Sequence, residues 1–456
     1  MAASLVLLPV LALASVHGEH ARTQPRPAAP VRVRTCDPPE AVGSFSASVY
    51  GYYAYWLGSV ADLPWDRLTH VAIFSVDVDG NGNLSGTEHW TDVAEQALAL
   101  AEPYGVHLHL AVTSFDAGVL DTMLSNPSAR ATAVDQLGEL VEMYGGHGVA
   151  VDFEGMDAGN IGDLTDFVEE LAARVGEVSV ATPAVDWAQA YDYPQLAAAA
   201  QSLFIMGYDY HWRGGDPGPV APLFGGGAWG QYALEWSVAD YLATGVPPEK
   251  IVLGLPLYGY TWPTVDDSVP GVASGDASSI LFSDAKAEAA MIGAQWDDVT
   301  HTPYYFPNGN TQTWYDDAAS LDDRIAWAIE DQALGGIGFW ALNYDGNDPE
   351  LWDMVKSHTQ IDEPDPGTTS GGDETGDAES TGDVPDPTTS TTAADDSTTD
   401  PPPDDDTTAA ASDGTTGPMA SGEQDDGCGC AQAPGNGALL LLLLPALRRR
   451  RASVPR

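Results

Sequence analysis

The sequence predicts an α/β fold, a single closed (β/α)8 TIM barrel, on the basis of three observations. Eight apolar runs of strand length occur between residues 36 and 359. Stretches with helical periodicity separate these runs, which is the alternation typical of parallel βαβ units. Several runs are continuously apolar, as expected for parallel strands that are buried on both faces, and the length of the segment suits one barrel.

The expected strands are Val49–Tyr55, His70–Ser75, His107–Val112, Gly148–Asp152, Val178–Thr182, Leu203–Gly207, Ile251–Leu255 and Gly336–Trp340. The helical patterns between them are Trp90–Ala101, Ala129–Met143, Ile161–Arg174, Gln231–Thr244 and Leu321–Leu334. The stretch from Thr261 to Trp314 is too long for a simple connection, so it predicts a small α+β insertion, about residues 261–314, between strands 7 and 8. Asn308-Gly309 is a hairpin-turn signal inside this insertion.

The composition restricts the class of partner. The chain has 456 residues and a formal net charge of −50, with 17 Lys and Arg against 67 Asp and Glu. Such an acidic chain excludes a nucleic-acid partner, which requires a basic face, and it also repels anionic polymers. Adaptation to saline surroundings is an alternative cause of the acidity. The three cysteines all lie outside the barrel segment, so no disulfide framework is expected there.

The N-terminus and the region after the barrel have the compositions of a targeting segment and a spacer. An apolar stretch at Leu5–Ser15 predicts a signal peptide over residues 1–18, although no Lys or Arg precedes it. We place a linker at residues 19–44 and the barrel at residues 45–360. Residues 361–427 are almost wholly Asp, Thr, Ser, Pro, Gly, Ala and Glu, which predicts a disordered acidic stalk.

Residues 428–456 combine three features in order. Cys428 and Cys430 come first, an apolar run at Ala438–Leu447 follows, and the cluster Arg448–Arg451 comes after it. The apolar run is shorter than the roughly 20 helical residues that span a bilayer core. This order resembles the C-terminal sorting tail of the myxobacterial type. The resemblance implies export, processing near the cysteines, and either attachment to the membrane or cell surface through the tail or release outside the cell.

Polar residues stand at the carboxyl ends of the expected strands, which is where barrels of this type carry their chemistry. Asp152 and Glu154 end the fourth strand, and alternate strand residues share a face, so the two side chains point the same way. Tyr208 and Asp209 end the sixth strand, and Trp340 ends the eighth. Acids at the end of an apolar strand are costly to bury unless they are paired or used. The alternative is that they only begin a solvated loop.

Several segments match one known family in the same order. They are Val49–Tyr53, Gly148–Glu154, Met206–His211, Leu253–Gly259, Trp314–Asp317 and Gly338–Ala341. The region from about Val49 to Val355 thus resembles glycoside hydrolase family 18, the chitinase-like barrels. The resemblance implies a retaining glycosidase in which the 2-acetamido oxygen of the substrate itself attacks the anomeric carbon.

The same resemblance implies a role for each candidate residue. It assigns proton donation to Glu154, orientation of the acetamide N–H to Asp152, and binding of the acetamide oxygen to Tyr208 with Asp209 beside it. It also implies that Trp340 is the apolar floor under the sugar and that Trp212 and Trp262 stack on sugars in outer subsites. Core packing is the alternative for Tyr208 and the tryptophans, and a loop cap is the alternative for Asp209. No cofactor and no metal ligand are expected.

The chain departs from the usual family pattern in two places. The fourth strand of the family usually reads Asp-Gly-x-Asp-x-Asp-x-Glu, and here His147 and Ala150 replace the first two acids. Asp152 therefore lacks its usual carboxyl partner. The third strand, Leu110–Phe115, lacks the common Ser-x-Gly-Gly. Together with the run Tyr208–Val220, it resembles the peptidoglycan-lytic glucosaminidases linked to the spore cortex.

These patterns predict an exported hydrolase that cleaves β-1,4 bonds of a polysaccharide containing N-acetylglucosamine. Chitin or chitooligosaccharides and peptidoglycan remain alternative substrates, since the strand resemblance favours peptidoglycan and the acidity favours a neutral polymer. The rival function is a catalytically silent, chitinase-like lectin. Lectins of this kind usually lose the Glu or its Asp partner, whereas Glu154 and Asp152 are both present.

Overall fold

The computed structural model describes residues 17–18, 20 and 44–361, and its largest sheet closes into a barrel. The eight barrel strands are β2 (Ser48–Ala54), β3 (His70–Val78), β5 (His107–Ser114), β6 (Gly148–Phe153), β7 (Glu177–Pro183), β8 (Ser202–Met206), β9 (Ile251–Pro256) and β15 (Gly336–Leu342). Neighbours in this series pair in parallel, and β15 pairs with β2 to close the ring. All eight expected strands are present, and the predicted (β/α)8 barrel is confirmed.

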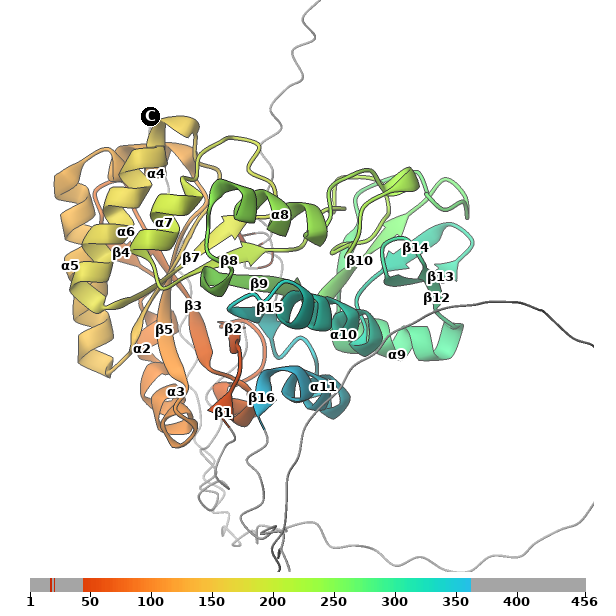
Figure 1. Cartoon of the computed structure of the whole chain (residues 1–456), viewed down its shortest axis with the longest axis horizontal. Coiled ribbons are helices and arrows are strands. Elements are labelled where there is room, and N and C mark those ends of the chain that lie inside the picture. The colour runs from red at the N-terminus through yellow and green to blue at the C-terminus, as the bar shows by residue number, and fades with distance from the viewer. Residues whose placement is uncertain (1–16, 19, 21–43, 362–456) are drawn as a thin grey trace, which may run out of the picture. The chain divides into compact units, whose positions relative to one another are not determined.

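Helices surround the strands (Figure 1). They are α2 (Glu88–Thr91), α3 (Ala94–Ala101), α4 (Ala117–Leu124), α5 (Pro127–Tyr144), α6 (Ile161–Val175), α7 (Tyr193–Ala199), α8 (Leu234–Thr244), α10 (Ala318–Ala326) and α11 (Pro349–Thr359). Local signals fix their ends. In α5, the Asn126 side chain accepts from Ser128 N, Pro127 occupies the first turn, and Gly145 ends the helix at φ 74°.

Three predicted helices differ most from the structure. The pattern Trp90–Ala101 is divided between α2 and α3, and α8 begins at Leu234 rather than at Gln231. The pattern Leu321–Leu334 begins earlier, as α10, because the Asp317 and Ser320 side chains form a capping box at its N-terminus. After Ala326 the chain continues as a π-helical turn, Trp327–Asp331.

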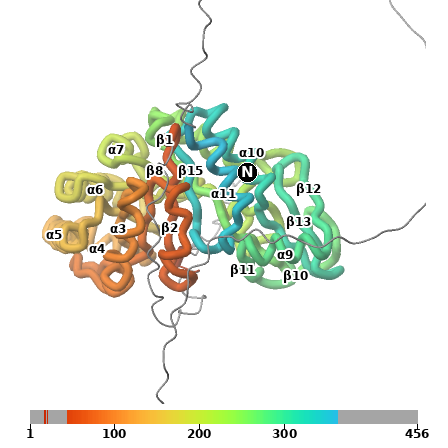
Figure 2. The backbone as a smooth tube through the Cα atoms, turned by 90° about the horizontal axis from the view of Figure 1, so that it is seen from below, coloured from red at the N-terminus to blue at the C-terminus, as the bar shows by residue number. Residues whose placement is uncertain are grey.

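The predicted insertion between strands 7 and 8 is a five-stranded antiparallel sheet with one helix. Its elements are β10 (Tyr258–Pro263), β11 (Ser278–Leu281), α9 (Phe282–Ile292), β12 (Gln295–Asp297), β13 (Thr302–Asn308) and β14 (Thr311–Trp314), with strand order β11-β10-β14-β13-β12. The expected hairpin turns directly after Asn308, which pairs with Thr311. Figure 2 shows β10 to β13 and α9 together on one side of the barrel strands.

Aromatic rings fill the inside of the barrel. Phe204 on β8 lies between two glycines of adjacent strands, because a Cβ at Gly254 or at Gly338 would stand 2.3 Å from its ring. The ring centroids of Tyr50 and Tyr52 on β2 lie 5.7 and 5.0 Å from that of Phe204. The glycines thus provide the space that this ring occupies.

The described chain ends next to its beginning. Two short strands, β1 (Ser44–Phe45) and β16 (Gln360–Ile361), pair antiparallel. Most of the predicted signal peptide, most of the linker, the acidic stalk and the sorting tail lie outside the described residues. Within the described part, no helix has the length and apolar character needed to cross a membrane.

Candidate active site

Three strand ends bring the predicted catalytic residues to one rim of the barrel. Asp152 is the fifth residue of β6 and is fully buried, whereas Glu154 follows the strand with 15% of its side chain exposed. Tyr208 follows β8 and is buried. Trp340 lies on β15 and is also buried. The structure therefore collects Asp152, Glu154, Tyr208 and Trp340 around one space at the carboxyl ends of the strands.

An imidazole from the N-terminal segment occupies the centre of this space. His17 Nδ1 lies 2.6 Å from Asp152 Oδ2, and His17 Nε2 lies 2.6 Å from the Tyr208 hydroxyl. The His17 ring stacks on Trp340, with centroids 3.7 Å apart and planes inclined by 24°. Glu154 Oε1 is 3.8 Å from His17 Nδ1. One small planar ring thus contacts or approaches all four predicted residues.

Further aromatic rings form the walls around His17. Tyr52 on β2 and Phe74 on β3 have ring centroids 5.7 and 5.8 Å from that of His17. His20 fills an adjacent position and accepts a hydrogen bond at Nδ1 from Trp340 Nε1 at 3.1 Å. Burial, and then the neighbouring His17, lower the pKa of His20 to about 3, so its ring is neutral.

Three polar atoms in this space have no hydrogen-bond partner among the described residues. They are Asp152 Oδ1, the Tyr52 hydroxyl and His20 Nε2. Ala150, which lies on the same face of β6 as Asp152, carries no polar group that could reach the free oxygen. Because an unsatisfied buried polar atom is costly, the site favours a ligand that supplies donors and acceptors here.

The Tyr208 hydroxyl is kept as a hydrogen-bond donor. Burial raises its pKa well above the usual 10, and the nearby Tyr52, Asp152 and Glu154 raise it further. Tyr208 is therefore protonated near neutral pH. A neutral phenol that faces a carbonyl oxygen can donate to it and so stabilise negative charge on that oxygen.

Asp209 anchors the insertion to the barrel. Its backbone has φ of 60°, and its carboxylate accepts hydrogen bonds from the Tyr258 hydroxyl at 2.5 Å and the Tyr260 hydroxyl at 3.3 Å. Both tyrosines are on β10, the first strand of the insertion. Asp209 therefore fixes the position of β10 beside Tyr208, in addition to the role beside Tyr208 that the sequence predicts.

The two tryptophans assigned to outer subsites have different environments. Trp262 is fully buried within β10, and its ring packs 5.4 Å from that of Tyr260. It has no exposed face for a sugar, so the scaffold alternative fits this residue. Trp212 is half-buried and lies against Gly214, where a Cβ would stand 2.5 Å from its ring. Part of this residue remains accessible to solvent.

Sequence reasoning missed several residues of the site. Tyr52, Phe74, Tyr258 and Tyr344 line the space around His17 and His20, yet the sequence assigned none of them a role, although it placed Tyr344 just after the eighth strand. His17 falls at the end of the predicted signal peptide, so no pattern connected it to the barrel. His17, Asp152 and Glu154 also form a group with one ligand atom each within 4.8 Å of one another, although Asp152 is already hydrogen-bonded to His17.

Comparison with known proteins identifies the family. The sequence profile described as "Glycosyl hydrolases family 18" matches residues 48–345, which is more than half of the chain. The chain belongs to glycosyl hydrolase family 18. It is therefore a chitinase-like glycoside hydrolase by family, and the matched residues contain every candidate site residue except His17 and His20.

Curated family 18 relatives come from different kinds of organism. A putative sporulation-specific glycosylase, YdhD, of Bacillus subtilis is 28% identical over 304 residues, which cover 63% of this chain and 69% of that protein. A cortical fragment-lytic enzyme of Bacillus anthracis is 22% identical over 313 residues, 64% of this chain and 69% of that protein. Di-N-acetylchitobiase of Rattus norvegicus is 28% identical over 252 residues, 48% of this chain and 66% of that protein.

Solved structures share the family 18 fold. A Group IV chitinase of Ostrinia furnacalis superposes with a TM-score of 0.63 at 21% identity and covers 68% of this chain and 99% of its own. A family 18 chitinase of Cycas revoluta in complex with (GlcNAc)3 superposes with a TM-score of 0.62 at 21% identity and covers the same shares of the two chains. At this identity the likeness establishes the barrel alone.

Proposed function

We propose that this protein is an exported retaining glycoside hydrolase that cleaves β-1,4 bonds of a polysaccharide containing N-acetylglucosamine. The contacts of His17 carry the proposal. Its ring offers one nitrogen to a buried carboxylate, one nitrogen to a phenol, and a flat face to Trp340. A 2-acetamido group is also small and planar, and it has an N–H for Asp152 and a carbonyl oxygen for Tyr208. His17 thus stands in for the acetamide of a bound sugar.

The proposed first step is attack by the acetamide oxygen on the anomeric carbon of the same sugar. The new oxygen–carbon bond forms as the glycosidic bond breaks, and Glu154 gives its proton to the departing oxygen. Asp152 accepts a hydrogen bond from the acetamide N–H. Its negative charge offsets the positive charge that develops on the ring that the acetamide forms with the sugar. Tyr208 donates to the acetamide oxygen and holds it in line, while Trp340 lies under the sugar.

The second step restores the enzyme. Glu154, now a carboxylate, takes a proton from water as that water attacks the anomeric carbon from the side that the leaving group vacated. The oxygen–carbon bond to the acetamide breaks and the sugar is released with retained configuration. The arrangement needs only one proton-transferring carboxyl group, because the substrate supplies the nucleophile. This agrees with a site in which both acids arise from one strand.

The proposed chemistry fits two substrates, and each of them is supported by a relative. Chitin and peptidoglycan both contain the 2-acetamido group that the mechanism requires. The similarity to a cortical fragment-lytic enzyme supports a peptidoglycan glycan, and that to di-N-acetylchitobiase supports a chitooligosaccharide. Export and location at the cell surface or outside the cell are part of the proposal. They are supported by the apolar stretch Leu5–Ser15 and the tail Cys428–Arg451.

The decisive experiment compares the wild type with Glu154→Gln on colloidal chitin, chitooligosaccharides and intact peptidoglycan. We expect the wild type to release reducing ends and the variant to lose about 10²- to 10⁴-fold in rate, because the amide cannot give up a proton. Glu142→Gln is the matched control, since Glu142 pairs with Arg174 on the surface. Mass spectrometry of the products identifies the substrate.

Two results would reject this function. If the wild type releases no reducing ends from any of the three substrates and binds them as tightly as Glu154→Gln, the protein is a lectin. If both proteins cleave at equal rates, a different residue supplies the proton.

A further inference from the structure

A second group of ionisable residues lies at the opposite end of the barrel. His70 begins β3, His107 and His109 lie at the start of β5, His147 directly precedes β6, and Glu177 begins β7. Register brings them together, because His70 pairs with His107, His109 with Gly148, and Gly148 with Glu177. Four of the ten histidines of the chain are therefore gathered at the amino ends of consecutive strands.

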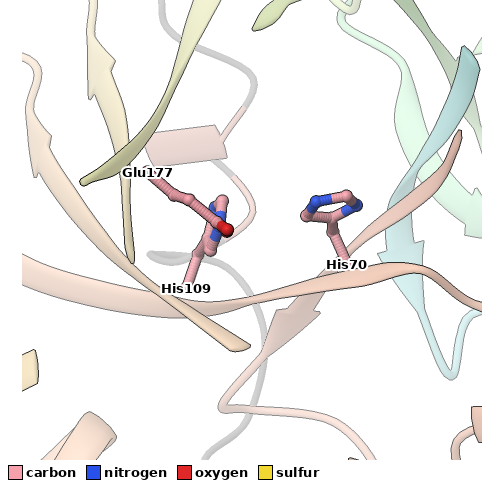
Figure 3. A group of neighbouring side chains, drawn as sticks. All are labelled: His70, His109 and Glu177. Carbon is pink, nitrogen blue, oxygen red and sulfur yellow. The ribbon is translucent and has the colours of Figure 1, made fainter. Parts of the chain in front are cut away.

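Three of these side chains meet closely. His70, His109 and Glu177 each offer one ligand atom, and the three atoms lie within 4.8 Å of one another. Figure 3 shows Glu177 beside the His109 ring, with His70 across from them. Ligand atoms around a tetrahedral zinc are roughly 3.3 Å apart, given metal–ligand distances near 2.0 Å. To hold such an ion, the side chains would have to rotate and close the difference.

Hydrogen bonds among the residues do not account for the whole group. Glu177 Oε2 accepts from His107 Nδ1 at 2.8 Å and lies 3.2 Å from His109 Nε2. His70 instead forms its hydrogen bond through Nδ1, with Thr69 Oγ1 at 2.8 Å, which leaves Nε2 as its ligand atom. Its ring centroid nevertheless lies 5.4 Å from that of His109. The His70 ring also stacks on that of Tyr50, with centroids 5.5 Å apart and planes inclined by 11°, and this packing places it beside the other two residues.

The other ring nitrogen of His109, Nδ1, has a hydrogen-bond partner, as is common for histidines that bind metals. Its Nδ1 is 3.0 Å from the Tyr50 hydroxyl, which in turn lies 2.8 Å from Ser179 Oγ. In the tautomer in which His109 Nδ1–H donates to the Tyr50 hydroxyl, Nε2 carries no proton and is available to a metal. The chain His109, Tyr50, Ser179 provides that support from inside the barrel.

The protonation states also suit a metal. Burial, and then the neighbouring histidines, lower the pKa of His70 to about 3, and burial lowers the pKa of His109. Burial alone would raise the pKa of Glu177, but hydrogen bonds from His109 and His107 lower it to about 2. Two neutral imidazoles and one carboxylate are therefore available, and His109 binds a cation through Nε2 when its proton is on Nδ1 rather than shared with Glu177.

We propose that His70, His109 and Glu177 bind one zinc ion at the amino end of the barrel, with a fourth position open to solvent. Nitrogen and carboxylate ligands select zinc over calcium or magnesium, which prefer oxygen ligands alone. Solvent reaches the site, because 28% of the Glu177 side chain is exposed. The ion joins β3, β5 and β7 far from Asp152, so its role is to stabilise the barrel.

The test uses the full chain, purified without a polyhistidine tag and freed of metal with a chelator. Zinc is titrated by calorimetry, and cobalt(II) serves as a spectroscopic probe of coordination. We expect one ion per chain, visible absorption bands of four-coordinate cobalt, and a higher thermal midpoint with zinc. His70→Gln and Glu177→Gln should each weaken binding by at least about tenfold.

Two control variants make the test specific. His358 contacts Asp322 and Glu330 on the surface, so His358→Gln removes an ordinary histidine–carboxylate cluster and should leave the affinity unchanged. Glu154→Gln disrupts the group at the opposite end and should also leave it unchanged. Circular dichroism of each metal-free variant checks folding, and half-buried His70 is the variant least expected to unfold. Absence of stoichiometric binding, binding that persists in His70→Gln, or binding lost in Glu154→Gln would overturn the proposal.

Discussion

Asp152 is fully buried, yet one of its carboxylate oxygens lacks a hydrogen-bond partner among the described residues. Its Oδ2 contacts His17, its Oδ1 has no partner among the described residues, and Ala150 on the same face of β6 offers no polar group. A buried carboxylate without enough donors is unfavourable. Under the proposed function, a ligand N–H that enters the pocket would supply the missing donor, and Asp152 would then favour amide-bearing sugars.

Tyr208 provides a sharp test at this scale. Tyr208→Phe removes one hydroxyl and leaves the ring packing in place. We expect kcat/KM on a chitooligosaccharide to fall by about 10²-fold, because one donor to a charge-bearing oxygen is lost. Tyr210→Phe is the matched control, since the Tyr210 hydroxyl contacts Ser237 of α8 at 2.6 Å. Equal losses in the two variants would show that Tyr208 acts only through packing.

At the scale of elements, the strands were predictable and some helix ends were not. Buried parallel strands require continuous apolar runs, and such runs are visible without the structure. The start of α10 depends on a side-chain contact between Asp317 and Ser320, and α8 begins after Ala233 without a side-chain cap. A helix start without a side-chain cap cannot be located from the hydrophobic pattern, so the predicted start of α8 at Gln231 was wrong.

The candidate site was predictable only in part for a related reason. Asp152, Glu154 and Tyr208 are polar groups that interrupt apolar strands, so the sequence marks them. Tyr52 and Phe74 are large apolar residues in strands and cannot be distinguished there from core. The group of His70, His109 and Glu177 is spread over more than 100 residues, and only strand register brings it together.

The glycines beside Phe204 give a prediction for the barrel interior. Gly338→Ala places a Cβ 2.3 Å from the Phe204 ring, which is held inside closed strands and has little room to move. We expect the free energy of unfolding to fall by about 1–3 kcal/mol through overpacking. Denaturant titration measures this difference.

A second glycine serves as its control. Gly162 lies in the first turn of α6, is exposed, and has no atom within 4 Å of an added Cβ. Gly162→Ala should therefore be neutral or stabilise by up to about 1 kcal/mol. If Gly338→Ala is as harmless as Gly162→Ala, the barrel interior is less tightly filled than the ring positions indicate.

At the scale of the whole molecule, the N-terminal segment and the barrel interact at the point where chemistry is proposed. His17 is hydrogen-bonded to Asp152 and Tyr208 and stacks on Trp340. His20 accepts a hydrogen bond from Trp340 Nε1. In the proposed mechanism a sugar needs the same atoms, so substrate and His17 would compete for one space. A chain that retains His17 therefore binds substrate only in the fraction of molecules from which this side chain is displaced.

Replacing His17 should relieve this competition. In a protein whose N-terminus is shown by mass spectrometry to include residue 17, His17→Ala should lower KM by at least about fivefold. Two buried hydrogen bonds and one stacked ring no longer have to be broken, each of which contributes about 1 kcal/mol. The turnover number should stay the same, because His17 is absent from the productive complex. His301→Ala is the control, since His301 pairs with Asp323 on the surface.

Free imidazole then distinguishes competition from a structural effect. Imidazole should inhibit His17→Ala competitively, because the vacated space still offers Asp152, Tyr208 and Trp340 to a planar ring with two nitrogens. It should inhibit the wild type much less, since the tethered ring of His17 has a higher effective concentration than a dissolved one. A KM that is equal in wild type and variant would mean that His17 does not occupy the pocket in solution. A lower turnover number in the variant would instead give His17 a part in the reaction itself.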